Sequence, residues 1–186
     1  MAFRRVACRT MAFAAMLALT GLGLTGVAAG FASTAQAEEF YVGEPVVKNG
    51  MQLVPNYLVG IEMDKMPKGM TMGPNTIHLE CDAHAAKDEP HGFAEDAWIP
   101  YLTISYTIEK VGSSFKATGK LQAMTAGDGP HYANNIEMDG PGQYHLTYKF
   151  LPPSAKGFLR HVDKATGVPA WWKPFSETFT FAYPQK

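Results

Sequence analysis

Apolar and polar residues alternate with a period of two through much of the chain beyond residue 38. Because successive side chains of a β-strand point to opposite faces, this period predicts strands that each bury one face. The clearest examples are residues 99–110, 143–150 and 175–183. Asn49-Gly50 separates two more extended runs, and this pair is favoured in tight hairpins because both residues tolerate a positive φ. The pattern predicts an all-β fold, an immunoglobulin-like antiparallel β-sandwich of about seven to nine strands.

One predicted strand, residues 76–84, has two faces of opposite chemistry. One parity is apolar and contains Cys81, which is expected to pack in the core as a small hydrophobic residue. The other parity carries only side chains that bind protons or metal ions: His78, Glu80, Asp82 and His84. The outer face of an antiparallel strand is usually polar and solvated. Two interpretations therefore remain open, an acidic and histidine-rich solvated face or a metal site.

Three further candidate ligands follow this strand in the chain. Residues 115–124 are predicted to form a single strand, which leaves Met124 on the polar side where packing does not explain it. A tight loop predicted over residues 127–132 presents His131, and His161 lies in a later irregular segment. Because loops of distant strands meet at the ends of a sandwich, these donors can converge with His78 and Glu80.

The donor set favours particular metals. Two or three imidazoles with one carboxylate and one thioether favour copper over calcium or magnesium, while the carboxylate keeps Cu(II), iron and manganese possible. No thiolate belongs to the set, which argues against a blue-copper centre. A structural zinc site needs no methionine.

Residues 62–74 form a loop rich in methionine. It contains Pro and Gly and holds four of the seven methionines beyond residue 37: Met63, Met66, Met70 and Met72. Methionine is most often a flexible filler of apolar cores. Thioethers are also soft donors for Cu(I), and a loop is not a core element, so both interpretations stay open.

The other histidines are given no metal role. His91 lies in a polar loop and is interpreted as an ordinary surface histidine, and His145 is predicted to face outward from its strand among polar neighbours. Neither enters the candidate ligand set.

The first 37 residues have the features of a secretory signal peptide. Three arginines precede an apolar run over residues 11–31, and Ala35-Gln36-Ala37 forms a small-residue cleavage site. Removal of residues 1–37 leaves 149 residues, 38–186, which we expect to form a single metal-binding domain. The loss of three arginines leaves 13 basic against 17 acidic residues, a net charge of −4. This charge argues against nucleic acid as a partner, and no later apolar stretch is long enough to span a bilayer.

Several segments together resemble a known family. Residues 77–80, Met124 with residues 128–132, and residues 157–163 are similar to the periplasmic, iron-uptake-associated, copper-binding family of FetP type. Residues 41–45 add to the match, and the resemblance extends over most of residues 40–183.

The resemblance implies a homodimeric immunoglobulin-like sandwich in the periplasm. It implies a copper site built from His78, Glu80, Met124 and His131, with His161 supplied from or lying near the partner subunit. It also implies a second position for iron or manganese that uses Glu80 and Asp128. The family is associated with an inner-membrane iron permease, so the expected function is to bind iron near copper and pass it to that permease.

Three alternatives remain beside this expectation. The copper centre could change the oxidation state of bound iron, which would make the protein a copper-dependent oxidase or reductase. The protein could be a copper chaperone whose methionine-rich loop accepts Cu(I). It could also be an adhesion-type sandwich that binds no metal.

Overall fold

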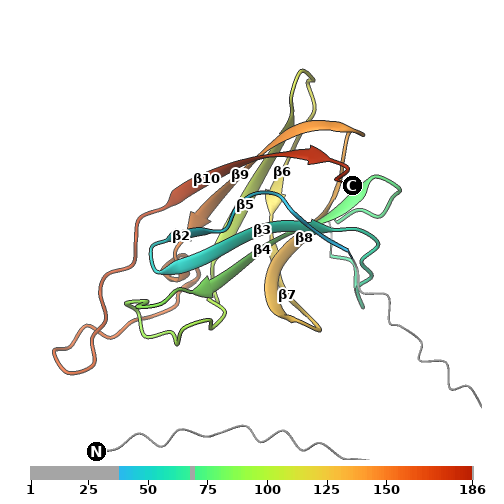
Figure 1. Cartoon of the computed structure of the whole chain (residues 1–186). Helices are drawn as coiled ribbons and strands as arrows, with labels where there is room; N and C mark the ends of the chain where they lie inside the picture. Colours follow the sequence, from blue (N-terminus) through green and yellow to red (C-terminus); the bar gives the residue numbers. More distant parts are fainter. Residues whose placement is uncertain (1–37, 68–69, 186) are drawn as a thin grey trace, which may run out of the picture. The chain divides into compact units, whose positions relative to one another are not determined.

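Two antiparallel β-sheets build the protein and form two layers around a shared apolar core (Figure 1). The computed structural model describes residues 38–67 and 70–185. The predicted signal peptide, residues 1–37, lies outside this part of the chain, so its removal stays a prediction. None of the helices in the described residues has the length and apolar character needed to cross a membrane.

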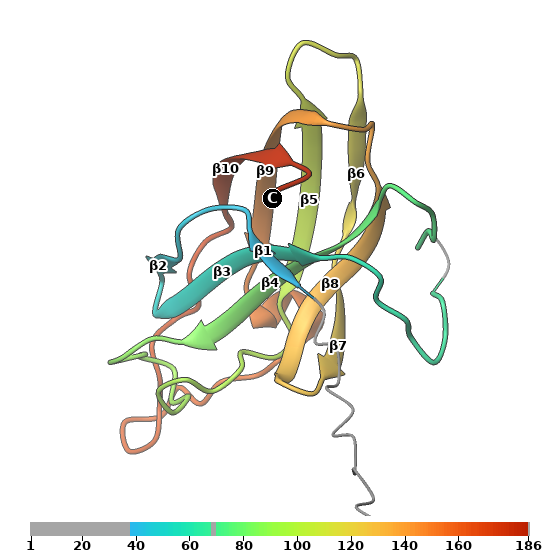
Figure 2. The same ribbon diagram turned by 45° about the vertical axis from the view of Figure 1, so that its right-hand side comes forward.

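The first sheet carries the candidate chemistry. Its strands are ordered β1-β3-β4-β8-β7, and β2 pairs with β3 beside this path. The strands are β1 (Glu39–Tyr41), β2 (Val46–Lys48), β3 (Met51–Leu58), β4 (Thr76–Ala85), β7 (Gln122–Ala126) and β8 (Gly129–Glu137). Figure 2 shows β4 in the middle of this sheet and β7 at its edge beside β8.

The second sheet closes the sandwich. Its order is β10-β9-β5-β6, with β5 (Thr103–Lys110), β6 (Lys116–Lys120), β9 (Gly142–Leu151) and β10 (Phe175–Tyr183). A short 3-10 helix, η1 (Pro153–Lys156), follows β9 and precedes the long irregular segment before β10.

The core lies between the facing sides of the two sheets. The apolar parity of the predicted strands over residues 99–110 and 143–150 is buried in β5 and β9: Ile104, Tyr106, Ile108, Tyr144, Leu146, Tyr148 and Phe150. From the first sheet, Ile77 and Leu79 of β4 pack into the same cluster, as does Cys81, which is buried as predicted. The sandwich prediction is thus confirmed, and the Asn49-Gly50 hairpin has the expected positive φ at both residues. The described residues form ten strands. The number exceeds the expectation because β1 and β2 are separate short strands, residues 115–124 form two strands, and β8 was not expected.

One predicted strand is divided between the two sheets. Residues 115–124 were expected to form a single strand, but they form β6 in one sheet and β7 in the other. Leu121 lies between them, is buried, and donates its backbone N–H to Ile104 O at 2.9 Å. The chain changes sheets at this residue, so side-chain parity does not continue across it.

A second prediction is wrong in a way that matters for the site. The tight loop expected over residues 127–132 is only a short turn, and β8 begins at Gly129. His131 therefore lies on a strand with β4 on one side and β7 on the other. The Gly-Asp-Gly-Pro sequence indicates a turn, but Pro130 is tolerated because it lies near the strand's beginning.

Candidate metal centre

The register of three strands brings the candidate ligands onto one face of the first sheet. His78 of β4 lies opposite Asn135 of β8, and Glu80 lies opposite Ala133. Met124 of β7 lies opposite His131 of β8, so their side chains share a face. Because His131, Ala133 and Asn135 alternate by two along β8, all of these side chains point to the same side. The small Ala133 leaves space between the two histidines.

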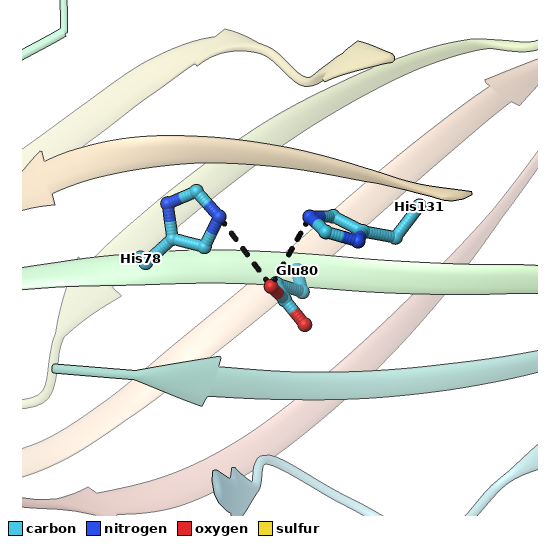
Figure 3. A group of neighbouring side chains, drawn as sticks. All are labelled: His78, Glu80 and His131. Carbon is cyan, nitrogen blue, oxygen red and sulfur yellow. Dashed lines mark ion pairs between the residues drawn. The ribbon is translucent and has the colours of Figure 1, made fainter. Parts of the chain in front are cut away.

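Three of these side chains converge closely. Glu80 Oε1 lies 3.4 Å from His78 Nε2 and 3.3 Å from His131 Nε2. One ligand atom from each residue can be chosen so that all three lie within 4.8 Å of one another. Figure 3 shows the two rings on either side of the Glu80 carboxyl group. His78, Glu80 and His131 are only 3%, 8% and 5% exposed. The interpretation of this strand face as solvated is therefore wrong at His78 and Glu80.

The hydrogen bonds of the two rings direct lone pairs toward the centre. His78 Nδ1 lies 2.6 Å from Asn135 Oδ1, and His131 Nδ1 lies 3.3 Å from the backbone oxygen of Gly129. A nitrogen that faces an oxygen acceptor carries the hydrogen, which leaves the other ring nitrogen with a free lone pair. Within the described residues, His131 Nε2 is buried and has no hydrogen-bond partner. Two bare nitrogens therefore face one carboxylate oxygen, an arrangement that only a proton or a cation can bridge.

The environment favours a proton at this place when no cation is bound. Burial, together with the smaller effect of the negative charges of Asp82, Asp128 and Glu39, raises the pKa of Glu80 to about 8. Burial also lowers the pKa of His78, an effect that the Asn135 hydrogen bond partly offsets. At neutral pH, Glu80 therefore holds a proton and His78 is neutral. A cation that binds here must displace that proton.

A group of carboxylates adjoins the three converging side chains. Asp128 lies in the turn between β7 and β8, and its charge raises the pKa values of Glu80, Glu39 and Asp82. Asp82 also accepts a hydrogen bond from Asn56 Nδ2 at 3.1 Å. Sequence reasoning placed Glu80 and Asp128 together only through the family resemblance. Glu39 had no signal, because it lies far away in sequence and is brought near by the β1–β3 pairing.

His161 is not among the three converging residues. It lies in the irregular segment after η1, its side chain is 75% exposed, and its Nδ1 lies 2.7 Å from Thr166 Oγ1. Leu159 and Val162 on either side of it are also exposed. The structure thus places His161 at the surface of this chain, apart from His78 and His131.

His91 is not an ordinary surface histidine, so that prediction is wrong. Its side chain is only 4% exposed, because it stacks on Trp171 with ring centroids 4.4 Å apart. Its Nδ1 lies 2.6 Å from Glu89 Oε1, within the same loop. The stacking on Trp171 fastens the loop after β4 to the irregular segment that carries His161. His145, in contrast, faces outward as predicted and lies 2.9 Å from Thr180 Oγ1.

Two of the loop methionines are exposed. Met66 and Met72 are largely accessible, which excludes a core-filling role for them. Met72 Sδ lies 3.6 Å from Asn135 Nδ2. The oxygen of the same Asn135 amide contacts His78.

The residues present fit copper. Two imidazole nitrogens and a carboxylate oxygen converge, and the thioether of Met124 lies on the same face beside His131. Mixed imidazole and thioether donors suit copper in both of its common oxidation states.

A family model and curated relatives match this chain. The model described as "Fe2+ transport protein" matches residues 36–184. A UPF0423 protein of Brucella abortus is 44% identical over 155 residues, which are 80% of this chain and 84% of that protein.

Solved structures of similar proteins share the fold. FetP of uropathogenic Escherichia coli strain F11 is 45% identical with a TM-score of 0.72, over 78% of this chain and 96% of that one. Copper-reconstituted P19 of Campylobacter jejuni is 41% identical with a TM-score of 0.73, over 79% of this chain and 97% of that one. A variant of FetP with copper bound is 44% identical, with a TM-score of 0.73 over 79% of this chain and 98% of that one.

Proposed function

The chain belongs to the Fe2+ transport protein family, and from this premise we propose that it is a periplasmic copper-binding protein of high-affinity iron uptake. It holds copper in the buried centre, binds iron beside it, and passes the iron to an inner-membrane iron permease. The observation that carries the proposal is the pair of bare imidazole nitrogens within 3.4 Å of Glu80 Oε1. Copper-bound FetP and P19, which are similar to this chain, support the choice of metal.

Copper has a defined set of ligands in this proposal. His78 and His131 provide neutral imidazoles, Met124 provides a thioether, and Glu80 provides a carboxylate. When bound, copper supplies a redox-active positive charge in a buried place. The protein's own contribution is to hold the two rings in fixed orientations through Asn135 and Gly129, and to exclude most water from them.

Iron is the cargo and binds to the acidic side of the same centre. Glu80 and Asp128 are the proposed iron ligands, and Glu39 and Asp82 add negative charge close by. Oxygen donors suit hard iron ions, and manganese with the same preference can substitute for iron. The exposed position of Asp128 gives iron access from solvent.

Isothermal titration of the mature protein with Cu(II), and separately with Mn(II) as the iron substitute, tests this assignment. Glu80→Gln should weaken the binding of both metals. His131→Gln should weaken mainly copper binding, and Asp128→Asn should weaken mainly manganese binding. Asp88→Asn is the matched control, because Asp88 is exposed and has a positive φ that asparagine tolerates. Equal loss of both metals in the His131 and Asp128 variants would contradict two adjoining sites.

A homodimer completes the proposal. The exposed His161 reaches the copper of the partner subunit, and the exposed Leu159 and Val162 beside it lie at the subunit contact. If copper binds only the assembled form with full affinity, it stabilises the dimer by mass action. Sedimentation of dilute wild-type and His161→Ala protein, each with and without copper, tests the linkage. Copper should tighten the wild-type dimer and have a smaller effect on the variant, and identical equilibria in all four samples would exclude the linkage.

A redox role is the second candidate. It is favoured by Glu80, which belongs to both proposed ligand sets and would place iron next to copper. Rapid mixing of copper-loaded protein with Fe(II), and separately with Fe(III), under controlled oxygen tests it. Catalytic, copper-dependent conversion of iron would make the protein an enzyme, whereas its absence leaves the binding and delivery function.

A further inference from the structure

Asn135 is buried on β8 and contacts two parts of the protein through opposite ends of one amide group. Its Oδ1 lies 2.6 Å from His78 Nδ1. Its Nδ2 donates to the backbone oxygen of Thr71 at 3.2 Å and lies 3.6 Å from Met72 Sδ. Asn135 therefore joins a candidate metal ligand to the methionine-rich loop. Figure 2 shows this loop, between β3 and β4, on the same side of the molecule as the end of β8.

The partners of the amide determine which way it points. The backbone oxygen of Thr71 is an acceptor only, and a thioether sulfur is a weak acceptor, so both require the NH2 end of Asn135. The carbonyl end must then face His78. Because a carbonyl oxygen only accepts, His78 Nδ1 must carry the hydrogen and Nε2 must carry the lone pair. That lone pair faces Glu80 Oε1, 3.4 Å away.

We propose that Asn135 is a positioning residue that holds His78 in the tautomer able to bind copper and couples this state to the Thr71–Met72 segment. The inference rests on the proposed function, because it concerns a ligand of the same centre. A small pocket of about 50 Å3, lined in part by Met72, His78 and Asn135, lies where the loop passes the ring. A segment that is fastened at this pocket keeps the amide, and through it the ring, in one orientation.

Two substitutions at this position separate the two contacts. Asn135→Asp keeps an oxygen acceptor for His78 Nδ1–H but removes the donor to Thr71 O. Asn135→Leu removes both and leaves the His78 Nδ1–H without an acceptor, so the hydrogen has reason to move to Nε2. There the carbonyl oxygen of the protonated Glu80 carboxyl group, or the carboxylate at higher pH, accepts it. Asn134 is the matched control, since it is the neighbouring buried asparagine but points to the other face, toward Tyr106 Oη at 3.2 Å and Lys120 O at 3.3 Å.

The first measurement uses copper-free protein. Long-range 1H–15N spectra of protein with 15N-labelled histidine report the tautomer of each ring, with the His78 signals assigned by their loss in His78→Gln. We expect the Nδ1–H tautomer in wild type, Asn135→Asp and Asn134→Leu, and the Nε2–H tautomer in Asn135→Leu. An Nε2–H wild type, or a tautomer that is the same in Asn135→Leu as in wild type, would overturn the positioning role.

The second measurement reports the loop. The backbone N–H groups of Met70 and Thr76 have their own hydrogen bonds on either side of the segment, to Pro67 O and Gly73 O. Their hydrogen exchange should be about threefold to tenfold faster in both Asn135 variants, which corresponds to the loss of one ordinary hydrogen bond, and unchanged in Asn134→Leu. Equal rates in Asn135→Asp and wild type would overturn the coupling to the loop.

Copper affinity then connects the positioning role to function. Loss of a residue that orients a histidine ligand typically costs about 10- to 100-fold in metal affinity, and we expect this loss in Asn135→Leu but not in Asn135→Asp. If wild type binds no copper but the tautomer switches as expected, the proposed function fails and the role of Asn135 stands. If copper binds and the tautomer does not switch, the role of Asn135 fails and the proposed function stands.

Discussion

Over residues 77–80, the two faces of β4 are buried to nearly the same degree but have different roles. Ile77 and Leu79 on one face are completely buried and pack into the sandwich core, while His78 and Glu80 on the other are almost as inaccessible. The first face lowers the free energy of folding by removing apolar area from water. The second removes ionisable groups from water, which costs free energy unless they are hydrogen-bonded or hold a cation. Burial alone therefore does not distinguish a face that stabilises the fold from a face that carries metal-binding side chains.

The largest difference between the faces should appear when an apolar side chain is shortened. Leu79→Ala should lower the free energy of unfolding by about 2–5 kcal/mol, because it leaves a cavity in the core. Copper affinity of the folded variant should stay within a fewfold of wild type. Urea unfolding of copper-free protein followed by copper titration checks both. A loss below about 1 kcal/mol would contradict the stabilising role assigned to the apolar face.

The next effect tests a hydrogen bond that joins the second sheet to the site strand. Tyr148 of β9 donates its hydroxyl across the core to the backbone oxygen of Glu80 at 2.7 Å. Tyr148→Phe leaves a buried acceptor unpaired and should cost about 1–3 kcal/mol of stability. Tyr144→Phe is the control, since Tyr144 lies on the same strand and donates to Gly140 O at 2.6 Å, in a turn away from the site. Urea unfolding compares the variants, and an equal or larger loss in the control would contradict this account.

The next difference between the two faces should appear in the dependence of stability on pH. The pKa of Glu80 in the folded protein is raised to about 8, so folding binds a proton that the unfolded chain has released. Stability from this proton is complete at low pH and is lost as pH rises through the folded pKa. Copper-free wild type should therefore lose about 1–2 kcal/mol between about pH 6.5 and 8 relative to Glu80→Gln.

The window is chosen to isolate Glu80. The pKa of His78 is lowered by burial, so below about pH 6.5 its protonation in the unfolded chain has the opposite effect on stability. Thermal unfolding at several pH values measures the difference. Glu95→Gln, which changes an exposed carboxylate, should follow wild type. Parallel stability curves for wild type and Glu80→Gln would mean that Glu80 is not protonated in the folded state.

The smallest effect on stability is expected at Met124. Met124→Leu nearly conserves volume on a partly exposed position, so it should cost less than about 1.5 kcal/mol. It should weaken copper binding, because it removes the soft donor beside His131. The control is Met138→Leu, which changes a methionine buried in the core. Isothermal titration with Cu(I) and Cu(II) decides the matter, and unchanged affinity for both ions would remove Met124 from the ligand set.

Alternation alone was enough to predict the sandwich. It placed Leu146 and Tyr148 in the core correctly, and the family match confirms the resemblance read from the segments around His78 and His131. It could not reveal that His78 and Glu80 on the polar face of β4 are buried, because a polar residue has the same place in the pattern whether it contacts water or another polar group. Asn135 shows why: its role depends on pairing with β4, which no local pattern contains.

Local turn signals and long-range contacts explain the remaining errors. The Gly-Asp-Gly-Pro sequence concealed the beginning of β8, and the adjacent Asn134 and Asn135 interrupted the apolar alternation that would have identified the strand. His91 was misread because its partner Trp171 comes 80 residues later. Contacts over such separations are set by the folded chain and leave no mark near either residue.

The alternation of side chains along β4 has a consequence for how correctly folded chains are separated from misfolded ones. A slip of one residue in the β4 register would turn His78 and Glu80 into the core and Ile77 and Leu79 out of it. No such chain could hold a cation between its imidazoles. If copper binds the correctly registered chain alone, it removes that chain from the pool of misassembled forms by mass action. The metal would then serve as a proofreading ligand, and copper occupancy would measure the fraction of molecules that had folded correctly.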